Sequence, residues 1–311
     1  MKKIIITGIT GMIGTALSDY LKGLGYEVSG ISRATSDARQ KNYQHFLGDV
    51  LDNEFLKKTW RSFRPDIVFH LAAQAYNGES YRAEDSTYLI NIQGTRNVLN
   101  VCRDYSPNAR IIPACSSAAY GFTDKQPITE DTQLRPVTPY GVTKATCEMM
   151  FLQYMHNYSM DVVIPRLFIT LGINHPPYTL VQNLAKQFAA YTLSGKAPLV
   201  HVGNLTTLRD YIDSYDVVRA LYVLMDKGDN GGVYNVCGQF GYSAKEIVEM
   251  FEIESGIKPE LVHDKSLLRP SDEPVLIGDN SRLKNLGWHK KKSVSESIHE
   301  IYENWLVRLK N

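Results

Sequence analysis

The chain has 311 residues, of which 43% are hydrophobic, so it is long enough for one large core or for two domains of a globular protein. Its 34 basic and 33 acidic side chains leave a formal charge of +1, which gives no electrostatic reason to expect nucleic acid or an anionic membrane as a partner. No apolar stretch approaches the roughly 20 residues that span a bilayer, and the first residues do not resemble a signal peptide.

Short apolar runs alternate with longer amphipathic segments over residues 1–166. Continuous apolar strands that alternate with helices are typical of a parallel sheet covered on both faces, so we expect an α/β fold with a doubly wound (Rossmann) sheet. The predicted strands are Lys3–Ile6, Glu27–Ser32, His45–Gly48, Ile67–Leu71, Ile111–Cys115 and Val162–Pro165. The predicted helices are Gly11–Leu24, Asn53–Phe63, Asp85–Asp104 and Thr138–Tyr158.

The alternation changes after Arg166, where loops rich in proline interrupt the pattern. We expect a first domain of residues 1–166, to which a segment near 211–238 returns, and a smaller C-terminal α/β lobe of residues 167–210 and 239–311. The predicted elements and loops of this part are a loop at Asn174–Tyr178, a helix at Leu180–Ser194, a strand at Leu199–Val202, a helix at Asp213–Asp226, a strand at Val233–Val236 and a loop at Arg269–Pro274.

Three glycines, Gly8, Gly11 and Gly14, follow the first predicted strand at intervals of three residues. Because a helix begins within this loop, its first backbone N–H groups and its dipole favour a pyrophosphate there. The spacing also occurs in ordinary strand–helix turns, but its position between a strand and a helix indicates a dinucleotide cofactor. We therefore expect Met12 and Ile13 to bind the cofactor together with the three glycines.

The end of the second predicted strand selects between NAD and NADP. A carboxylate there would bind the adenosine ribose of NAD, whereas this chain has Ser32 and Arg33. A hydroxyl and a guanidinium suit a 2′-phosphate, so NADP(H) is favoured and NAD(H) is the alternative. Arg33 could equally be a solvated loop arginine. Asp49 ends the third strand, where it would accept a hydrogen bond from the adenine amino group or cap the helix that begins at Asn53.

Polar residues at the ends of later strands indicate a catalytic site. Tyr140 and Lys144 form Tyr-x-x-x-Lys, and a helix places residues four apart on one face. An ammonium close to a phenol stabilises the phenolate, which suits acid–base chemistry, although many helices carry this pair by chance. Ser116 follows the fifth predicted strand, where a hydroxyl faces the crevice in which ligands bind. Small residues, Ala72 and Ala73, after the fourth strand let a cofactor lie close.

These motifs together resemble the extended short-chain dehydrogenase/reductase family. They occur in the family's order and spacing over about two-thirds of the chain. The matching motifs are Gly8-x-x-Gly11-x-x-Gly14, Asp49-Val50, His70-Leu71-Ala72-Ala73, Asn91-x-x-Gly94-Thr95, Ser116-Ser117, Tyr140-x-x-x-Lys144 and Arg209-Asp210-Tyr211.

The resemblance implies an enzyme that acts on a nucleotide sugar with a nicotinamide cofactor. It implies Tyr140 as the acid/base, Lys144 as its partner and ribose anchor, and Ser116 as the hydroxyl that polarises the reacting sugar oxygen. The expected cofactor-binding residues are Gly8, Gly11, Met12, Ile13, Gly14, Ser32, Arg33, Asp49, Val50, Leu71, Ala72, Ala73, Tyr140, Lys144 and Leu167.

Within that family the chain is more similar to the branch that acts on GDP-mannose derivatives, in particular its GDP-4-keto-6-deoxy-mannose reductases. The similar segments are Leu134–Lys144, Ala185–Gln187, Val202–Leu205 and Arg269–Gly278. The resemblance implies that arginines hold the diphosphate and nucleotide and that Asp272 reaches hydroxyl groups or guanine, although Arg209 could instead form a salt bridge with a neighbouring carboxylate. The expected substrate-binding residues are Ser117, Asn174, Lys186, Arg209, Arg269 and Asp272.

Two positions depart from the pattern of this branch. Dehydratases of the group carry an acid and a base just after the catalytic hydroxyl, where this chain has Ser117 and Ala118, so we do not expect 4,6-dehydration. Ile169 stands where an asparagine usually touches the substrate, and Thr170 or Asn174 are the candidates to compensate.

We therefore expect hydride transfer at C4 of a GDP-linked (deoxy)mannose- or heptose-type sugar, as a 4-ketoreductase or a C4 dehydrogenase. The alternatives are an NAD-dependent nucleotide-sugar 4-epimerase and a catalytically silent cofactor-binding module. The cysteines are scattered, so we expect no disulfide framework, no metal site and a cytoplasmic location. A homodimer through helices Asp85–Asp104 and Thr138–Tyr158 is expected from the resemblance, although the sheet could equally cover their apolar faces.

Overall fold

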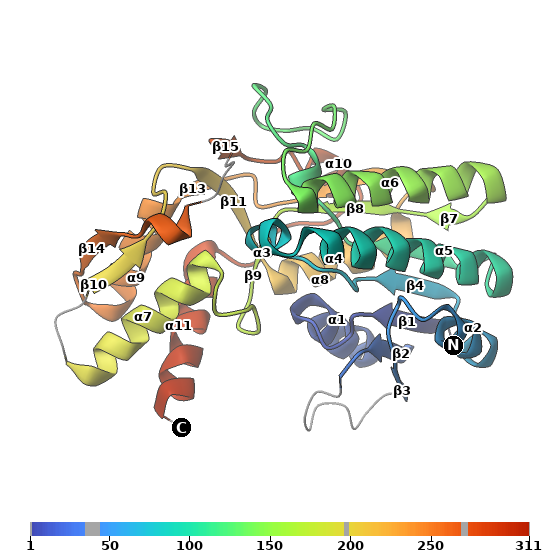
Figure 1. The fold of residues 1–311 in the computed structure, drawn as a ribbon, viewed down its shortest axis with the longest axis horizontal. Helices are drawn as coiled ribbons and strands as arrows, with labels where there is room; N and C mark the ends of the chain where they lie inside the picture. Colours follow the sequence, from blue (N-terminus) through green and yellow to red (C-terminus); the bar gives the residue numbers. More distant parts are fainter. Residues whose placement is uncertain (1, 35–43, 196–198, 269–272, 311) are drawn as a thin grey trace.

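A parallel sheet of six strands forms the centre of the larger half of the protein (Figure 1). The computed structural model describes residues 2–34, 44–195, 199–268 and 273–310. Its strand order, β3-β2-β1-β4-β5-β7, changes direction beside β1, which confirms the doubly wound α/β fold. The strands are β1 (Lys3–Thr7), β2 (Glu27–Ser32), β3 (Gln44–Leu47), β4 (Ile67–His70), β5 (Arg110–Pro113) and β7 (Asp161–Val162).

The side chains of β1 alternate between the two faces of this sheet, as the two-residue period of a strand requires. Ile4 and Ile6 lie in a buried core cluster with α1 and α8, whereas Ile5 lies in a second cluster with α2, α5 and α6. Helices therefore cover both faces, and a continuously apolar strand is the result. These helices are α1 (Met12–Gly23), α2 (Asn53–Phe63), α5 (Gly94–Tyr105), α6 (Pro139–Tyr158) and α8 (Ser214–Lys227).

The helix predicted at Asp85–Asp104 is not one continuous α-helix. It consists of α4 (Glu84–Tyr88), a π-helical turn (Leu89–Gln93) and α5, and a short helix that the sequence analysis did not predict, α3 (Asn77–Arg82), precedes it. The π turn inserts an extra residue into the helix, and such turns are frequent at functional sites. Figure 1 shows α4 and α5 running beside α6.

Segments from the second half of the chain complete the first half. β8 (Ile164–Leu167) pairs in parallel with both β6 (Cys115–Ser116) and β12 (Val233–Val236), and α8 packs on α1. Leu283, in α10 (Ser281–Asn285), is buried in the same core cluster as β1, and so is Trp288. The sequence patterns did not predict this second return. The domain boundaries given above therefore stay a proposal.

In the smaller half, α7, α9 and α11 lie against one another (Figure 1). They enclose a separate core that includes Phe188, Phe251 and Trp305. Strands β10 and β14 form a parallel pair, and β11 pairs with β9, β13 and β15. No helix in the described part of the chain is long and apolar enough to cross a membrane. The remaining elements are β9 (Ile169–Leu171), α7 (Leu180–Ser194), β10 (Leu199–Val202), β11 (Leu208–Asp213), β13 (Gly241–Ser243), α9 (Ala244–Ser255), β14 (Glu260–His263), β15 (Val275–Leu276), α11 (Val294–Lys310) and the 3-10 turns Ser117–Ala119 and Lys265–Leu267.

Candidate active site

The glycine loop between β1 and α1 is too tight for side chains. Gly8 has a φ of +73°, and a Cβ atom on it would lie 2.8 Å from the backbone nitrogen of Ala72. A Cβ on Gly14 would lie 2.4 Å from the carbonyl oxygen of Gly8, and one on Gly11 3.2 Å from the same oxygen. Since these neighbours are backbone atoms that cannot move aside cheaply, only glycine fits at Gly8 and Gly14.

The N-terminus of α1 carries no side-chain cap and no acidic residue in its first turn. By contrast, side chains cap the N-termini of α2, α6, α8 and α9. The first backbone N–H groups of α1, at Met12, Ile13 and Gly14, thus remain available for an anion, which the helix dipole also favours. This loop therefore fits the pyrophosphate of a dinucleotide.

The side chains at the end of β2 differ in their availability to a cofactor. The Ser32 hydroxyl is buried, donates to the carbonyl oxygen of Ala34 at 2.7 Å and lies 2.8 Å from Nε2 of His45. Its single hydrogen is therefore already used. Arg33 is exposed, and its guanidinium has no partner within the described ranges of the chain.

Asp49 does not cap the helix after β3. Its Oδ1 atom accepts a hydrogen bond of 2.9 Å from the backbone N–H of Leu51. The helix cap is Asp52, whose carboxylate accepts from the N–H of Phe55 at 3.0 Å, so the capping role considered for Asp49 was wrong. Val50 is buried, and its side chain lies against the position of Gly94 in α5.

The segment after β4 is fixed to the end of β1. Thr7 accepts backbone hydrogen bonds from Leu71 (3.1 Å) and Ala72 (3.2 Å), and its Oγ1 lies 2.8 Å from Nδ1 of His70. The other ring nitrogen of His70, Nε2, lies 3.1 Å from Oγ1 of Thr95. Burial, with a smaller contribution from the charge of Lys144, lowers the pKa of His70 to about 3, so this imidazole is neutral at physiological pH.

The helix α6, which carries Tyr140 and Lys144, starts against the turn that follows β6. Thr138 caps α6 by accepting from the N–H of Gly141 at 2.9 Å and donates to Oδ1 of Asn77 at 2.8 Å. A Cβ on Gly141 would lie 2.5 Å from the carbonyl oxygen of Ala118, so helix and turn touch at the backbone. This contact brings Ser116 to the same edge of the sheet as the first turns of α6.

Lys144 is buried, and its Nζ donates a hydrogen bond of 2.7 Å to the carbonyl oxygen of Ala114. The same ammonium lies 5.6 Å from the ring centroid of Tyr140, one helical turn earlier. Tyr140 is half-buried, and its hydroxyl has no hydrogen-bond partner among the residues that the structure describes. Ser116 accepts from the N–H of Ala118 at 3.2 Å and pairs in register with Leu167 of β8.

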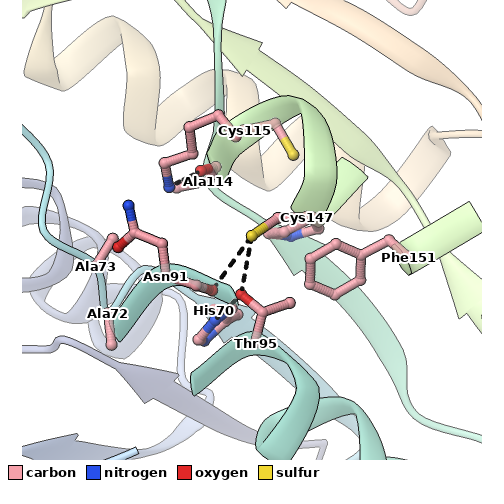
Figure 2. Close-up of a pocket in the computed structure, with 11 residues that line it drawn as sticks. His70, Ala72, Ala73, Asn91, Thr95, Ala114, Cys115, Cys147 and Phe151 are labelled. Atoms are coloured by element: carbon pink, nitrogen blue, oxygen red, sulfur yellow. Dashed lines mark hydrogen bonds between the residues drawn. The ribbon is translucent and has the colours of Figure 1, made fainter. Parts of the chain in front are cut away.

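A small cavity of about 10 Å³ lies beside Lys144, which is about the room that one water molecule needs (Figure 2). Asn91, in the π turn, lines it and joins two walls of the site. Its amide accepts from the N–H of Gln74 at 2.8 Å and donates to Oγ1 of Thr143 at 2.9 Å. The motif Asn91-x-x-Gly94-Thr95 signalled this residue in the sequence, but not its contacts.

A buried ion pair joins α6 to β8. Glu148, one turn after Lys144, accepts two hydrogen bonds from Arg166 of β8, at 2.9 Å and 2.5 Å. The guanidinium also donates to the hydroxyl of Tyr120 at 2.8 Å and to the carbonyl oxygen of Glu130 at 2.9 Å. The sequence analysis did not identify Glu148. Its only signal in the sequence was its position four residues after Lys144.

The predicted substrate-binding residues do not form one cluster. Ser117 is buried in the turn beside Ser116, whereas Asn174 and Lys186 lie next to α11. Arg209 is buried, and its guanidinium lies 3.7 Å from Oε2 of Glu273, which is the ion pair considered as its alternative role. Two further predicted residues lie outside the described residues; they are Arg269 and Asp272.

Neither candidate to compensate for Ile169 presents an amide beside it. Ile169 lies in β9 opposite Tyr211 of β11. Thr170 is buried and donates to the carbonyl oxygen of Phe168 at 3.3 Å. The side chain of Asn174 is directed to Arg308 of α11, at 3.5 Å.

A second pocket, of about 510 Å³, lies along α7. Its volume is typical of pockets that hold a small organic ligand. The pocket contains the predicted residue Lys186 and lies beside the loop that precedes α7. It is lined by Pro177, Tyr178, Asn183, Lys186, Gln187, Ala190 and Tyr191.

The fold and this site define a class of protein. A glycine loop with an uncapped helix stands at one end of β1, and Tyr140, Lys144 and Ser116 stand at the carboxyl edge of the same strands. This arrangement is that of the extended short-chain dehydrogenases/reductases, which use a nicotinamide dinucleotide. The family model described as GDP-mannose 4,6 dehydratase matches residues 5–301, and the chain therefore belongs to that family.

Known proteins of several activities are similar to this chain over nearly its whole length. The GDP-6-deoxy-D-mannose reductase of Pseudomonas aeruginosa is 27% identical over 312 residues, which cover 99% of both chains. The GDP-mannose 4,6-dehydratase of Vibrio cholerae is 27% identical over 349 residues, which cover 96% of this chain and 92% of the relative.

Two solved structures have the same fold. The structure of RMD from Pseudomonas aeruginosa complexed with NADPH has a TM-score of 0.87 at 26% identity, and the match covers 99% of this chain and 100% of that one. The UDP-glucose 4-epimerase of Thermotoga maritima with UDP-glucose has a TM-score of 0.91 at 27% identity, and the match covers 99% of each chain. The predicted enzyme class is confirmed: the chain is a nicotinamide-dependent oxidoreductase of nucleotide sugars.

Proposed function

We propose that the enzyme transfers a hydride between NADP(H) and C4 of a GDP-linked (deoxy)mannose- or heptose-type sugar, as a 4-ketoreductase or C4 dehydrogenase. The observation that carries the proposal is the hydroxyl of Tyr140, which has no hydrogen-bond partner in the described part of the chain and lies one turn before Lys144, whose ammonium is bound to the carbonyl oxygen of Ala114. The similarity to a GDP-6-deoxy-D-mannose reductase supports this choice of substrate.

The chain's own residues supply binding and proton transfer. The cofactor, when bound, gives or takes the hydride. The N–H groups at the start of α1 hold its pyrophosphate, and Lys144 holds ribose hydroxyls. In the reducing direction Tyr140 gives a proton to the oxygen on C4, Lys144 stabilises the phenolate that remains, and the hydroxyl of Ser116 donates to the same oxygen. The opposite proton movement accompanies oxidation of a C4 alcohol.

The residues after Ser116 argue against a 4,6-dehydratase. Ser117 and Ala118 occupy the positions after the catalytic hydroxyl, and both are buried in a 3-10 turn. Neither side chain is an acid or a base near neutral pH, so elimination of water would lack its proton acceptor there. A hydride transfer without dehydration needs no such pair.

The pocket along α7 is our candidate site for the nucleotide. Lys186 and Gln187 line it, and α7 begins without a side-chain cap or an acidic residue in its first turn. A nucleotide sugar brings a planar base and a diphosphate whose oxygens suit an ammonium and free N–H groups. We assign the base as guanine because of the similarity to enzymes of GDP sugars.

The preference for NADP(H) rests on Arg33. Its exposed guanidinium has no partner in the part of the chain that the structure describes, and it stands at the end of β2, where the adenosine ribose is expected. Ser32 adds no donor, because its hydrogen goes to Ala34. A solved relative is complexed with NADPH, whereas the dTDP-glucose 4,6-dehydratase of Bacillus anthracis is complexed with NAD.

We further propose a cytoplasmic homodimer. All four cysteines are free and buried, as expected for a reducing compartment. Leu89 before α5, and Met149 and Tyr158 on α6, are exposed apolar or aromatic side chains on neighbouring helices, so pairing of these helices with a second copy would cover them. Light scattering of the purified protein and of Met149→Glu tests this; a monomeric wild type contradicts it.

The decisive test has two steps. Mass spectrometry of the cofactor released on denaturation identifies any bound dinucleotide. The enzyme is then assayed with GDP-4-keto-6-deoxy-mannose and NADPH or NADH, in wild type and in Tyr140→Phe. We expect NADPH oxidation by the wild type, and loss of turnover with retained cofactor binding in the variant. Unchanged turnover of the variant would exclude this mechanism.

A 4-epimerase is the second candidate, because the solved UDP-glucose 4-epimerase matches the whole chain with a TM-score of 0.91. An epimerase uses the same three side chains to oxidise C4 and to reduce it on the other face. It would retain tightly bound NAD and convert a GDP sugar without net change in the absorbance of NADPH. Product analysis by NMR separates the two reactions.

A further inference from the structure

We propose that Tyr76 is a further substrate-binding residue, whose hydroxyl hydrogen-bonds the sugar beside Tyr140, and that His175 and Tyr178 fix its ring in that position. The proposal deepens the function proposed above and rests on it. It assigns a specificity-determining contact to the loop after β4, outside the set of residues that the sequence motifs indicated.

The backbone of Tyr76 is held by the side chain of Gln74 and by the N–H of Ser80, which donates to the Tyr76 carbonyl oxygen at 3.0 Å. The amide of Gln74 accepts from the N–H of Tyr76 at 2.5 Å and donates to its carbonyl oxygen at 3.1 Å. Gln74 is itself bound to Asn91 of the π turn. On the other side, Asn77 accepts from Thr138, the cap of the catalytic helix. Tyr76 therefore lies on a short segment anchored to both walls of the site.

The ring of Tyr76 is held by two rings from the loop between β9 and α7. Tyr178 meets it edge to face, with ring centroids 5.2 Å apart and planes at 86°, and His175 lies 5.7 Å away. Edge-to-face contacts at this separation are favourable. The cluster joins the larger half of the protein to the loop that precedes α7, where the nucleotide pocket begins.

The hydroxyl of Tyr76 is the one part of this residue that is not held. Within the described ranges it has no hydrogen-bond partner, although the side chain is half-buried. Burial raises the pKa of Tyr76, and the charges of Tyr178 and Tyr140 raise it further, so the phenol stays neutral. Asn77, the neighbour of Tyr76, accepts a hydrogen bond from Thr138, two residues before Tyr140, so Tyr76 lies near the end of α6 that carries Tyr140. The hydroxyl is not sealed from the solvent, so a ligand that enters the site can reach it and form a hydrogen bond with it.

The chemistry of the cluster selects the sugar rather than the diphosphate. Burial lowers the pKa of His175 to about 4, so the imidazole is uncharged near neutral pH. Neither it nor a neutral phenol offers the positive charge that a diphosphate requires. A neutral donor and acceptor beside aromatic surface instead match a sugar ring, which carries hydroxyl groups on an otherwise apolar frame.

The test compares binding of GDP-mannose with binding of GDP, by calorimetry on the cofactor-loaded enzyme. Tyr76→Phe removes the hydroxyl and keeps the ring contacts. We expect it to weaken GDP-mannose binding by roughly five- to tenfold and to leave GDP binding unchanged, as for loss of one neutral hydrogen bond. Tyr20→Phe is the matched control. Tyr20 lies on α1, is half-buried, and forms an edge-to-face pair with Tyr222 of α8. We expect Tyr20→Phe to change neither the Kd for GDP-mannose nor the Kd for GDP.

Equal weakening of GDP and GDP-mannose would overturn the proposal, because it would show a general effect on the fold. Unchanged binding of both would overturn it too. If the wild type binds neither GDP nor GDP-mannose, UDP-glucose and UDP are the second pair of probes. Weaker binding of UDP-glucose, with unchanged binding of UDP, in Tyr76→Phe then upholds the sugar contact and refutes a GDP sugar as substrate. If no nucleotide of either pair binds the wild type, this proposal and the proposed function are both wrong.

Discussion

Lys144 and Ala114 are joined by a hydrogen bond of 2.7 Å that fixes the ammonium of Lys144 beside the end of β5. The contact orients a flexible side chain before any ligand binds, and it leaves two N–H groups of the ammonium for the contacts that we propose with Tyr140 and the cofactor ribose. Fixed positions of this kind lower the cost of reaching the transition state.

We therefore expect Lys144→Met to lower kcat by roughly a hundredfold or more, because the phenolate of Tyr140 loses the charge that stabilises it. Steady-state kinetics at saturating cofactor measures this. Lys57→Met, on the outer surface of α2, is the control. A kcat for Lys144→Met within about threefold of wild type would show that the ammonium is not needed for proton transfer.

Gly14→Ala should damage the cofactor site. The new Cβ would lie 2.4 Å from the carbonyl oxygen of Gly8, so the loop must move away from the start of α1. We expect the Kd for NADPH, measured by fluorescence titration, to rise by roughly tenfold or more. Gly23→Ala, in the last turn of the same helix with nothing within 4 Å, should leave this Kd unchanged. Equal affinities for both variants would contradict the predicted pyrophosphate site.

Arg33→Ala should reduce the preference for NADPH. Loss of one charge-assisted contact to the 2′-phosphate is expected to raise the KM for NADPH roughly tenfold. The KM for NADH should stay the same, since NADH lacks that phosphate, and it serves as the internal control. A parallel rise of both constants would assign Arg33 to the fold rather than to cofactor selection.

Glu148→Gln should destabilise the fold strongly. Both partners of the Glu148–Arg166 pair are nearly fully buried, and removal of one charge leaves the other without compensation. Such changes cost about 3–5 kcal/mol, which urea denaturation would detect. Glu54→Gln removes an exposed ion pair with Lys57 and should cost less than about 1 kcal/mol. Similar losses of unfolding free energy in the two variants would contradict the prediction that burial makes the Glu148–Arg166 pair the more costly one to break.

His70 should make the protein sensitive to acid. Its pKa is lowered from 6.5 to about 3 in the folded state, so as the pH falls the unfolded chain takes up the proton first. Protonation of His70 does not reduce the free energy of unfolding above pH 6.5, but it reduces this free energy progressively as the pH falls from 6.5 toward 3. The slope approaches roughly 1.4 kcal/mol per pH unit within that window. Thermal unfolding of His70→Gln should show a shallower pH dependence than wild type, and identical slopes would contradict this.

The sequence predicted most of the first half because its signals are local. The apolar run at residues 4–6 and the glycines after it determine a strand and a tight turn by steric constraints alone. The π turn at Leu89–Gln93 was missed since a helix with one extra residue keeps an almost helical pattern of apolar positions. Very short strands such as β6 and β15 give no period to detect.

The candidate site was predictable only where a motif sits on one element. Tyr140 and Lys144 are neighbours on α6, and Ser116 comes close through the Gly141–Ala118 contact. By contrast, Tyr76 and His175 are brought together from loops about a hundred residues apart, and no spacing along the chain encodes such a meeting. The lack of an amide at Ile169 was visible in the sequence, but the bond of Thr170 to Phe168 and the contact of Asn174 with Arg308 were not.

The return of β12 and Trp288 to the first half has a consequence for synthesis of the chain. β1 and α1 are made first, yet the core cluster that holds them also needs α8 and Trp288, which leave the ribosome about 200 residues or more later. At roughly 5–20 residues per second, the face of the sheet that carries Ile4 and Ile6 stays exposed for many seconds. The nascent N-terminal half is thus the stage at which a chaperone is needed most, and residues 1–166 made alone should aggregate.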